Sequence, residues 1–457
     1  MSRTSTEGPA FRRALAVTVA SLIVLCAVFL ALGYLQGPKL SSAQVDTKGV
    51  VEQGGQQVRL FANQAVAQVK HSQVTVTPST DFTVSTQGDI IAVQFDSRLK
   101  YATDYHVSIE GVTSVYLAQP STISYGFTTT SPTLYYLDRG DAGDDIVTTG
   151  LSGSARTVVY SATQIQDFAV LDHFLAVVAL NDDHTSSLSF VNTDTSVVEA
   201  VRLPETGSIS ALDASAAGNT VGFALTSAVP GLGQKNNSTL YTIDLTAGRA
   251  VTPVVGLSGD PITVLGWQFL PGTGNLLALT FDRSLLLIDP VSATVSPLGQ
   301  FLGFDKISVD GLTVTMTDAF GEVSLTLATG DVQRLEPSPV DGKRTFQGAT
   351  AMLPSGARIQ KVVVPDATGR RFSSLLVYDD GATSRVLYKT PNDGGSISDF
   401  TVSPNGQYVA IETVPDASAA VSDGYFYDAR ATSVTTVIVD VDSGAQTRSV
   451  EGFTLRW

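Results

Sequence analysis

The stretch Asp399–Thr413, DFTVSPNGQYVAIET, decides how most of the chain is interpreted. Two apolar runs flank Pro404–Asn405–Gly406, and residues of these types favour a tight turn, so the stretch predicts two antiparallel strands. Related stretches, each with two apolar runs around a polar turn, lie upstream. They are DFAVLDHFLAVVAL (Asp167–Leu180), ALDASAAGNTVGFAL (Ala211–Leu225) and GWQFLPGTGNLLALTF (Gly266–Phe281).

A second repeated unit alternates with the first and consists of an apolar strand, a small turn and a polar strand ending in Val or Leu. Its copies span Leu188–Val201, Leu240–Val254, Leu285–Leu298, Val323–Leu335 and Thr436–Val450. They begin roughly 40–50 residues apart, with a gap that one more copy near Leu375–Lys389 would fill. This period is typical of four-stranded blades. We therefore predict an all-β fold whose residues 132–457 form a β-propeller of about seven blades, with six or eight as open alternatives.

The turn motif strengthens this interpretation by resemblance. Phe400-x-x-Ser-Pro-Asn-Gly-x-x-Val-Ala resembles the inner hairpin of TolB-like and WD-like propellers. The first blade holds only three expected strands, which begin at Leu134–Asp138. The chain's last residues, Gly452–Trp457, read as a lone inner strand. We predict that this strand completes the first blade and closes the ring, because closure removes exposed sheet edges.

Residues 45–131 alternate apolar and polar side chains with a period of two, which predicts about seven short strands and a small β-sandwich. Three segments resemble a bacterial Ig-like domain: GDIIAVQF (Gly88–Phe95), LKYATDYHVSIEGV (Leu99–Val112) and YGFTTTSP (Tyr125–Pro132). The resemblance implies a stalk, a spacer or a docking surface.

Residues 14–35 contain no charge and are long enough to span a bilayer as a single transmembrane helix. Arg12 and Arg13 precede this run, which predicts a cytoplasmic tail over residues 1–13 and an extracytoplasmic bulk after a linker over residues 36–44. Cleavage as a signal peptide near Ala31–Gly33 is the alternative. Leu25 before Cys26 does not fit a lipoprotein signal.

Composition limits the classes of function. Charged residues make up 16% of the chain and hydrophobic residues 43%, so a folded protein is expected. The formal net charge is −15, which disfavours nucleic-acid binding and adhesion to anionic lipid. Cys26 is the only cysteine, so the soluble part has no disulfide and no thiolate site. We interpret the chain as a bacterial cell-membrane protein.

Several polar clusters have the residue types of functional sites without the required spacing. The Gly/Ser turns 150–154 and 256–260 lack a nucleophile elbow's second glycine, and the remaining clusters match neither a zinc pattern nor an EF-hand loop. We therefore predict no catalytic, cofactor-binding or metal-binding residues, no cofactor and no enzymatic activity. The clusters are His173 and His184 with Asp172, Asp182 and Asp183; Asp138, Asp141, Asp144 and Asp145, which include the tripeptide Arg139–Asp141; the sequon Asn236–Thr239; and His71 with His106.

These observations predict a membrane-anchored scaffold whose propeller binds a protein, a peptide or a cell-envelope component. A sensor or accessory subunit of an envelope signalling or transport system is one alternative. A hydrolase or lyase acting on glycans is another, but it needs a pair of carboxylates that the dispersed acidic residues do not indicate.

Overall fold

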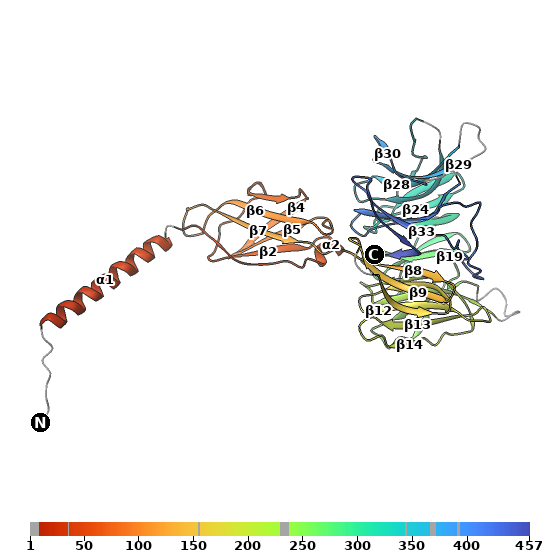
Figure 1. Cartoon of the computed structure of the whole chain (residues 1–457), viewed down its shortest axis with the longest axis horizontal. Coiled ribbons are helices and arrows are strands. Elements are labelled where there is room, and N and C mark those ends of the chain that lie inside the picture. Colours follow the sequence, from red (N-terminus) through yellow and green to blue (C-terminus); the bar gives the residue numbers. More distant parts are fainter. Residues whose placement is uncertain are drawn as a thin grey trace, which may run out of the picture. The chain divides into compact units, whose positions relative to one another are not determined.

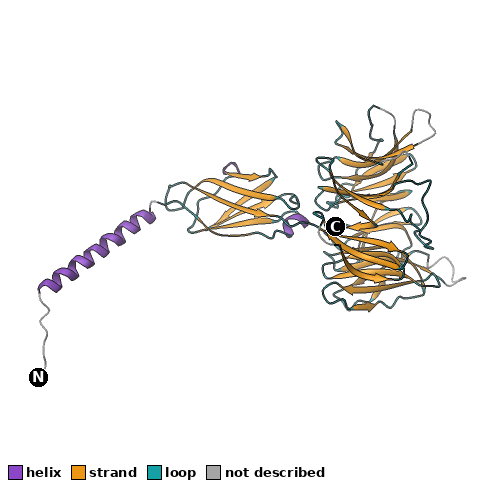
Figure 2. Ribbon diagram, in the orientation of Figure 1, coloured by secondary structure: helices purple, strands orange, loops and turns teal. Residues whose placement is uncertain are grey.

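The chain is described by a computed structural model that covers residues 9–34, 36–153, 156–228, 237–342, 345–365, 372–390 and 394–457. Strands dominate, and one long helix lies at the N-terminus (Figure 2). The chain divides into two compact units, Met1–Thr130 and Ser131–Trp457.

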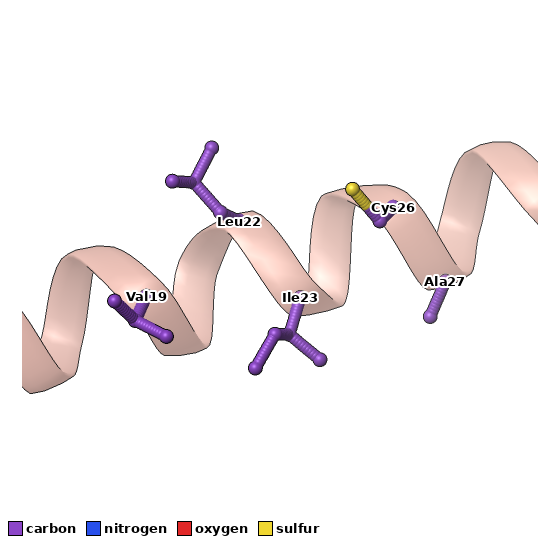
Figure 3. A pocket seen from close by; sticks show the side chains of 5 residues that line it. All are labelled: Val19, Leu22, Ile23, Cys26 and Ala27. Carbon is purple, nitrogen blue, oxygen red and sulfur yellow. The ribbon is translucent and has the colours of Figure 1, made fainter.

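Helix α1 (Pro9–Tyr34) begins before the uncharged run and includes Arg12 and Arg13. Its window Phe11–Val28 has a mean hydropathy of 1.9, and none of this window is buried against the described protein. By length and composition, this helix is a candidate membrane span or signal sequence. Figure 3 shows five of its side chains, Val19, Leu22, Ile23, Cys26 and Ala27, which form a shallow apolar surface on a single helix.

The rest of the first unit is built from two antiparallel sheets with a short helix, α2 (Gly49–Glu52), and a 3-10 turn, η1 (His71–Gln73). Phe95 on one sheet and Phe127 on the other have ring centroids 6.3 Å apart, so the two sheets share one core. Alternate residues of the strands are buried, as the period-two pattern predicts. In order, the sheets are β1 (Leu40–Gln44), β2 (Gln57–Ala62), β5 (Ile90–Phe95) and β4 (Phe82–Gln87); and β3 (Val74–Thr77), β6 (Asp104–Val112) and β7 (Ser121–Thr128).

The predicted linker over residues 36–44 is wrong in its second half. Strand β1 occupies Leu40–Gln44 and pairs with β2. The sequence LSSAQ hides this strand because β1 lies at a sheet edge and buries none of its side chains fully. The apolar alternation that marks a strand is therefore missing.

The second unit contains seven four-stranded antiparallel sheets in its described residues. From the innermost strand outward, the first is β35 (Phe453–Arg456), β8 (Thr133–Gly140), β9 (Gly143–Gly150) and β10 (Thr157–Ala162). The next three are β11 (Ile165–Val170), β12 (Phe174–Leu180), β13 (Ser186–Asn192) and β14 (Val198–Ala200); β15 (Gly207–Ser215), β16 (Thr220–Ser227), β17 (Thr239–Asp244) and β18 (Val251–Pro253); and β19 (Val264–Phe269), β20 (Leu276–Thr280), β21 (Ser284–Asp289) and β22 (Thr294–Gln300). The last three are β23 (Gly303–Ile307), β24 (Thr313–Asp318), β25 (Gly321–Thr326) and β26 (Val332–Arg334); β27 (Phe346–Met352), β28 (Arg358–Pro365), β29 (Phe372–Asp379) and β30 (Ser384–Lys389); and β31 (Ser396–Val402), β32 (Tyr408–Val414), β33 (Thr435–Asp440) and β34 (Gln446–Glu451).

These sheets form a closed ring. Innermost strands of neighbouring sheets contact one another in the order β35, β11, β15, β19, β23 and β27. The seventh sheet closes the ring, because its β31 contacts β29 of the sixth sheet and its β32 contacts β35 of the first. The predicted pairing of the last strand with the first sheet is confirmed: β35 pairs with β8, and in Figure 1 the blue C-terminal end lies beside β8. Phe168, Val414 and Phe453, from three different sheets, are buried together at this closure.

Polar side chains join the sheets at their boundaries. Asp144 accepts a 2.6 Å hydrogen bond from the N–H of Ile165 on the next sheet. Asp305 accepts one of 2.9 Å from the N–H of Thr350, and Glu412 accepts one of 2.6 Å from the N–H of Thr454. Each innermost strand also has a register shift where it pairs with its neighbour, which leaves backbone groups for such contacts.

Candidate functional site: the upper face and the channel

All seven sheets present the same end to one face of the ring, here called the upper face, where the innermost strands begin. At two junctions, hydrogen bonds join the start of a third strand to the start of the next innermost strand. Thr436 of β33 donates a 2.8 Å hydrogen bond to the carbonyl of Gly452, just before β35. The N–H of Ile209 in β15 donates a 2.9 Å hydrogen bond to Ser186 Oγ in β13. The opposite, lower face carries the turns between first and second strands.

Charged side chains line the ring's interior. Arg456 and Asp167 lie 3.6 Å apart, and Lys306 Nζ lies 2.8 Å from Asp399 Oδ1. Burial raises the pKa values of Asp167 and Asp213, and the charge of Arg456 partly opposes this rise. Burial also lowers the pKa of Lys361, against the attraction of Asp399. The interior of the ring therefore holds charged side chains of both signs, and oppositely charged ones lie close together.

A long connection, residues 415–434, crosses the upper face from the seventh sheet towards the second, and we call it the strap. The hydroxyl of Tyr425 donates a short hydrogen bond to Asp144 of the first sheet. Phe426 stacks on His184 of the second sheet, with ring centroids 4.3 Å apart. The strap thus covers the junction at which the ring closes.

Arg139 fixes the strap to the ring. Its guanidinium Nη1 donates a 2.6 Å hydrogen bond to Asp423, and its Cζ lies 3.5 Å from the centre of the Tyr425 ring. The side chain is only 6% exposed, and it also donates to the carbonyls of Ile165 and Gln166. A buried arginine with this many partners rigidifies its surroundings.

A polar cavity of 420 Å³ opens beside this cluster, between the first and seventh sheets. Its lining includes Asp138, Arg139, Asp423, Thr432, Ser433 and Glu451. Hydroxyls and carboxylates predominate, so the cavity suits a hydrophilic group that donates hydrogen bonds.

A second buried polar cluster lies between the fifth and sixth sheets. Glu322 Oε2 accepts hydrogen bonds from Thr350 Oγ1 at 2.7 Å and from the side-chain amide of Gln347. Burial, together with the neighbouring carboxyl of Asp305, raises the pKa of Glu322 to about 7. Glu322 is 7% exposed and bonded to protein groups, so the cluster joins sheets and does not offer an open site.

The fold separates the two histidines weighed in the sequence, but it keeps Asp138 and Asp145 opposite each other on β8 and β9, where both contact Arg156. His173 lies in the lower-face turn between β11 and β12, 3.0 Å from Asp194, whereas His184 lies in the upper-face turn between β12 and β13. Asp138 pairs with Arg156, and Asp144 bonds the strap. Among the residues that the structure describes, no group of three or more His, Cys, Asp or Glu side chains could hold a metal ion.

The remaining motifs lie in turns or outside the described residues. Residues 256–260 form a turn closed by the N–H of Gly256 and the carbonyl of Asp260, 2.9 Å apart. Ser154 and Asn236 fall outside the described residues, so the motifs 150–154 and 236–239 are only partly described. His71 stacks on Phe82 in the sandwich, far in sequence from the propeller clusters.

No protein-family model matches the chain, and no curated protein matches its sequence. Solved structures similar to it include TolB from Acinetobacter baumannii, at 12% identity and a TM-score of 0.37 over 84% of this chain and 82% of TolB. A putative 6-phosphogluconolactonase from Bacteroides fragilis matches at 11% identity and a TM-score of 0.42 over 71% of this chain and 97% of its own. Dihydro-heme d1 dehydrogenase NirN matches at 12% identity and a TM-score of 0.41 over 71% of this chain and 74% of its own. These similarities concern the propeller fold and not a ligand.

The prediction that the chain is not an enzyme is corrected by these structures. Two of the three are named as enzymes, and they share the propeller fold. The prediction failed because it took the missing sequence motifs as grounds for excluding catalysis. Propellers host unrelated activities, so neither the fold nor those missing motifs excludes an enzymatic activity.

Proposed function

We propose that the chain is a membrane-anchored binding protein of the bacterial cell envelope. Helix α1 anchors it with the N-terminus in the cytoplasm, an Ig-like sandwich serves as the spacer, and the seven sheets are the blades of a propeller that binds a protein, a peptide or an envelope component. The observation that carries the proposal is the exposure of the whole Phe11–Val28 window. An apolar helix of this length requires lipid around it.

The upper face supports the binding role. The chain enters the propeller at Thr133, and the pairing of Thr133 with Gly150 places this end of β8 at the lower face. The upper face, with its cavity and strap, is therefore at the other end of β8 from Thr133, where the chain enters the propeller.

Cysteine labelling in intact cells tests the anchored topology. In a Cys26→Ser background, the exposed turn residue Ala328 is changed to Cys and treated with a membrane-impermeant maleimide. We expect labelling without lysis, whereas the matched variant Ser5→Cys should be labelled only after lysis. A propeller cysteine that reacts only after lysis would refute the topology. Release of wild-type protein into the soluble fraction would instead identify α1 as a cleaved signal.

Site-specific photo-crosslinking tests the binding role. A photoreactive phenylalanine analogue replaces Ala142, in the upper-face turn between β8 and β9, or Ala328, in a lower-face turn as the matched control. We expect a discrete adduct in intact cells from position 142 and none from position 328. No adduct from either position would contradict binding at the cavity and strap, and an adduct from position 328 alone would contradict binding at the upper face.

A further inference from the structure

Large apolar side chains are exposed along one part of the upper face. Four residues, Phe281, Leu302, Phe346 and Phe372, are between 45% and 51% exposed, and Phe320 is 88% exposed. Together we call them the apolar arc. Each lies at the upper-face end of its sheet. Phe281 and Phe320 lie in turns between second and third strands, and Leu302 precedes an innermost strand. Phe346 and Phe372 are the first residues of β27 and β29.

Hydrogen bonds and one ring contact connect the three sheets that carry the apolar arc. The N–H of Phe301 donates to the carbonyl of Arg283 at 3.0 Å, and the N–H of Leu302 donates to the carbonyl of Thr317 at 2.7 Å, so Leu302 joins the fourth and fifth sheets. The hydrogen bond between Glu322 and Gln347 joins the fifth to the sixth. Phe346 and Phe372 meet edge to face, with ring centroids 6.4 Å apart.

The exposed aromatic rings are not spread evenly. Every exposed phenylalanine in the described part of the propeller lies on the upper face, including Phe426 of the strap. In the lower-face turns, the exposed large apolar residues are aliphatic: Val197, Val291 and Leu312. Random exposure of apolar residues would not sort the rings to one end.

The size of the apolar arc indicates a peptide-sized contact. If each whole side chain counts as about 200 Å², the exposed fractions of the five side chains amount to about 550 Å². This reaches the upper range of the largest apolar patch on an ordinary monomer, but it falls short of the roughly 800 Å² per partner of a standard protein interface. The area therefore fits a short segment of another chain better than a folded domain.

Charged groups around the apolar arc are already engaged. Arg334 makes two hydrogen bonds to Asp318, at 2.8 and 2.6 Å, and its Cζ lies 6.0 Å from the ring centre of Phe320. Arg283 donates to the carbonyl of Leu302, and Asp282 accepts from Thr280. Lys343, Arg344, Arg370 and Arg371 lie outside the described residues. The described charged groups beside the apolar arc thus have protein partners, and its described surface is mainly apolar.

We infer that the apolar arc is a docking site for a short peptide segment of a partner protein that presents two or more aromatic or large aliphatic side chains. This inference rests on the proposed binding function and names its ligand class. A second copy of this chain fits less well, because contact between two strongly acidic units is repulsive. A lipid surface fits less well because the chain's excess negative charge repels anionic headgroups.

Peptide selection on the full-length protein in nanodiscs tests the inference. Phage displaying random dodecapeptides are selected, and the enriched sequence is synthesised with a fluorophore for anisotropy measurements. We expect enrichment of spaced aromatic or large aliphatic residues, and at least a tenfold rise in Kd for Phe320→Ala and Phe372→Ala. The matched control Val291→Ala removes an exposed apolar side chain from the lower face and should leave Kd unchanged. Unchanged melting temperatures confirm that the variants fold.

Other outcomes overturn the inference. If the selected peptides bind wild type and both phenylalanine variants with equal Kd, the apolar arc is not the docking site. The proposed binding function would still stand. Phe320-dependent binding to vesicles of phosphatidylglycerol and phosphatidylethanolamine, without peptide enrichment, would identify a lipid ligand. A wild-type dimer that Phe320→Ala converts to a monomer would identify a second copy as the occupant.

Discussion

Replacing Glu322 with Gln should stabilise the propeller above neutral pH. In the native protein, Glu322 Oε2 accepts hydrogen bonds from Thr350 at 2.7 Å and from Gln360 at 3.4 Å, in addition to Gln347. Burial beside the carboxyl of Asp305 raises its pKa from an ordinary 4.5 to about 7. Gln reproduces the neutral, protonated form, since its carbonyl oxygen can keep the acceptor role and its amide can donate towards Asp305.

The size of this stabilisation follows from the difference in the pKa of Glu322 between the folded and the unfolded protein. Between pH 4.5 and about 7, the folded protein retains the Glu322 proton while the unfolded chain releases it, so the free energy of unfolding falls as pH rises. The gap between the two pKa values corresponds to about 3 kcal/mol. The loss is complete above about pH 7. The neutral Gln side chain removes this loss, so the variant's advantage should grow from near zero at pH 4 to about 3 kcal/mol at pH 8.

Urea denaturation followed by tryptophan fluorescence measures this effect, because both tryptophans, Trp267 and Trp457, lie in the propeller. The difference between variant and wild type is compared at pH 4.5, 6 and 8. Glu336→Gln, which neutralises an exposed carboxylate in a nearby loop, is the matched control and should follow the wild type. Parallel pH profiles for wild type and Glu322→Gln, or a variant less stable at pH 8, would refute the reasoning.

Three further changes probe the ring. Deleting residues 452–457 removes β35 and exposes the edge of β8, so the melting temperature should fall sharply, and a chain that melts like wild type would disprove closure by that strand. Arg139→Met leaves the buried Asp423 unpaired and should cost about 3–5 kcal/mol in urea denaturation, whereas the exposed Arg156→Met control should cost less than about 1 kcal/mol; equal costs would contradict this. Gly222→Ala places a Cβ in steric conflict with the Trp267 ring of the next sheet, so calorimetry should show a loss of about 1–3 kcal/mol. An unchanged melting temperature would show that the Trp267 ring can move aside without cost.

The sequence predicted those features that depend on neighbouring residues. Alternation and turn residues indicated the repeated strands, and the unmatched strand at Gly452–Trp457 indicated ring closure. Strand β1 escaped detection because an edge strand need not bury an apolar side chain. The gap near Leu375–Lys389 is occupied by β29 and β30, as the spacing of the repeats suggested.

Contacts between single side chains far apart in the sequence were not predictable in this way. Arg139 and Asp423 are separated by 284 positions, and no local pattern marks either one as a partner of the other. His173 and His184 show the opposite error, because their closeness in sequence suggested a shared site. One strand, β12, runs between them from the lower face to the upper face and separates them by its whole length. The apolar arc likewise combines residues from three sheets.

Pairing the final strand with the first sheet has a consequence for biosynthesis. Because β8 leaves the ribosome more than 300 residues before β35, the edge of β8 stays unpaired for most of the chain's synthesis. Any ribosomal stall, premature stop codon or trimming by a carboxypeptidase before Phe453 yields a product whose first sheet lacks its innermost strand. Such a product exposes a free strand edge, which a protease or chaperone can recognise.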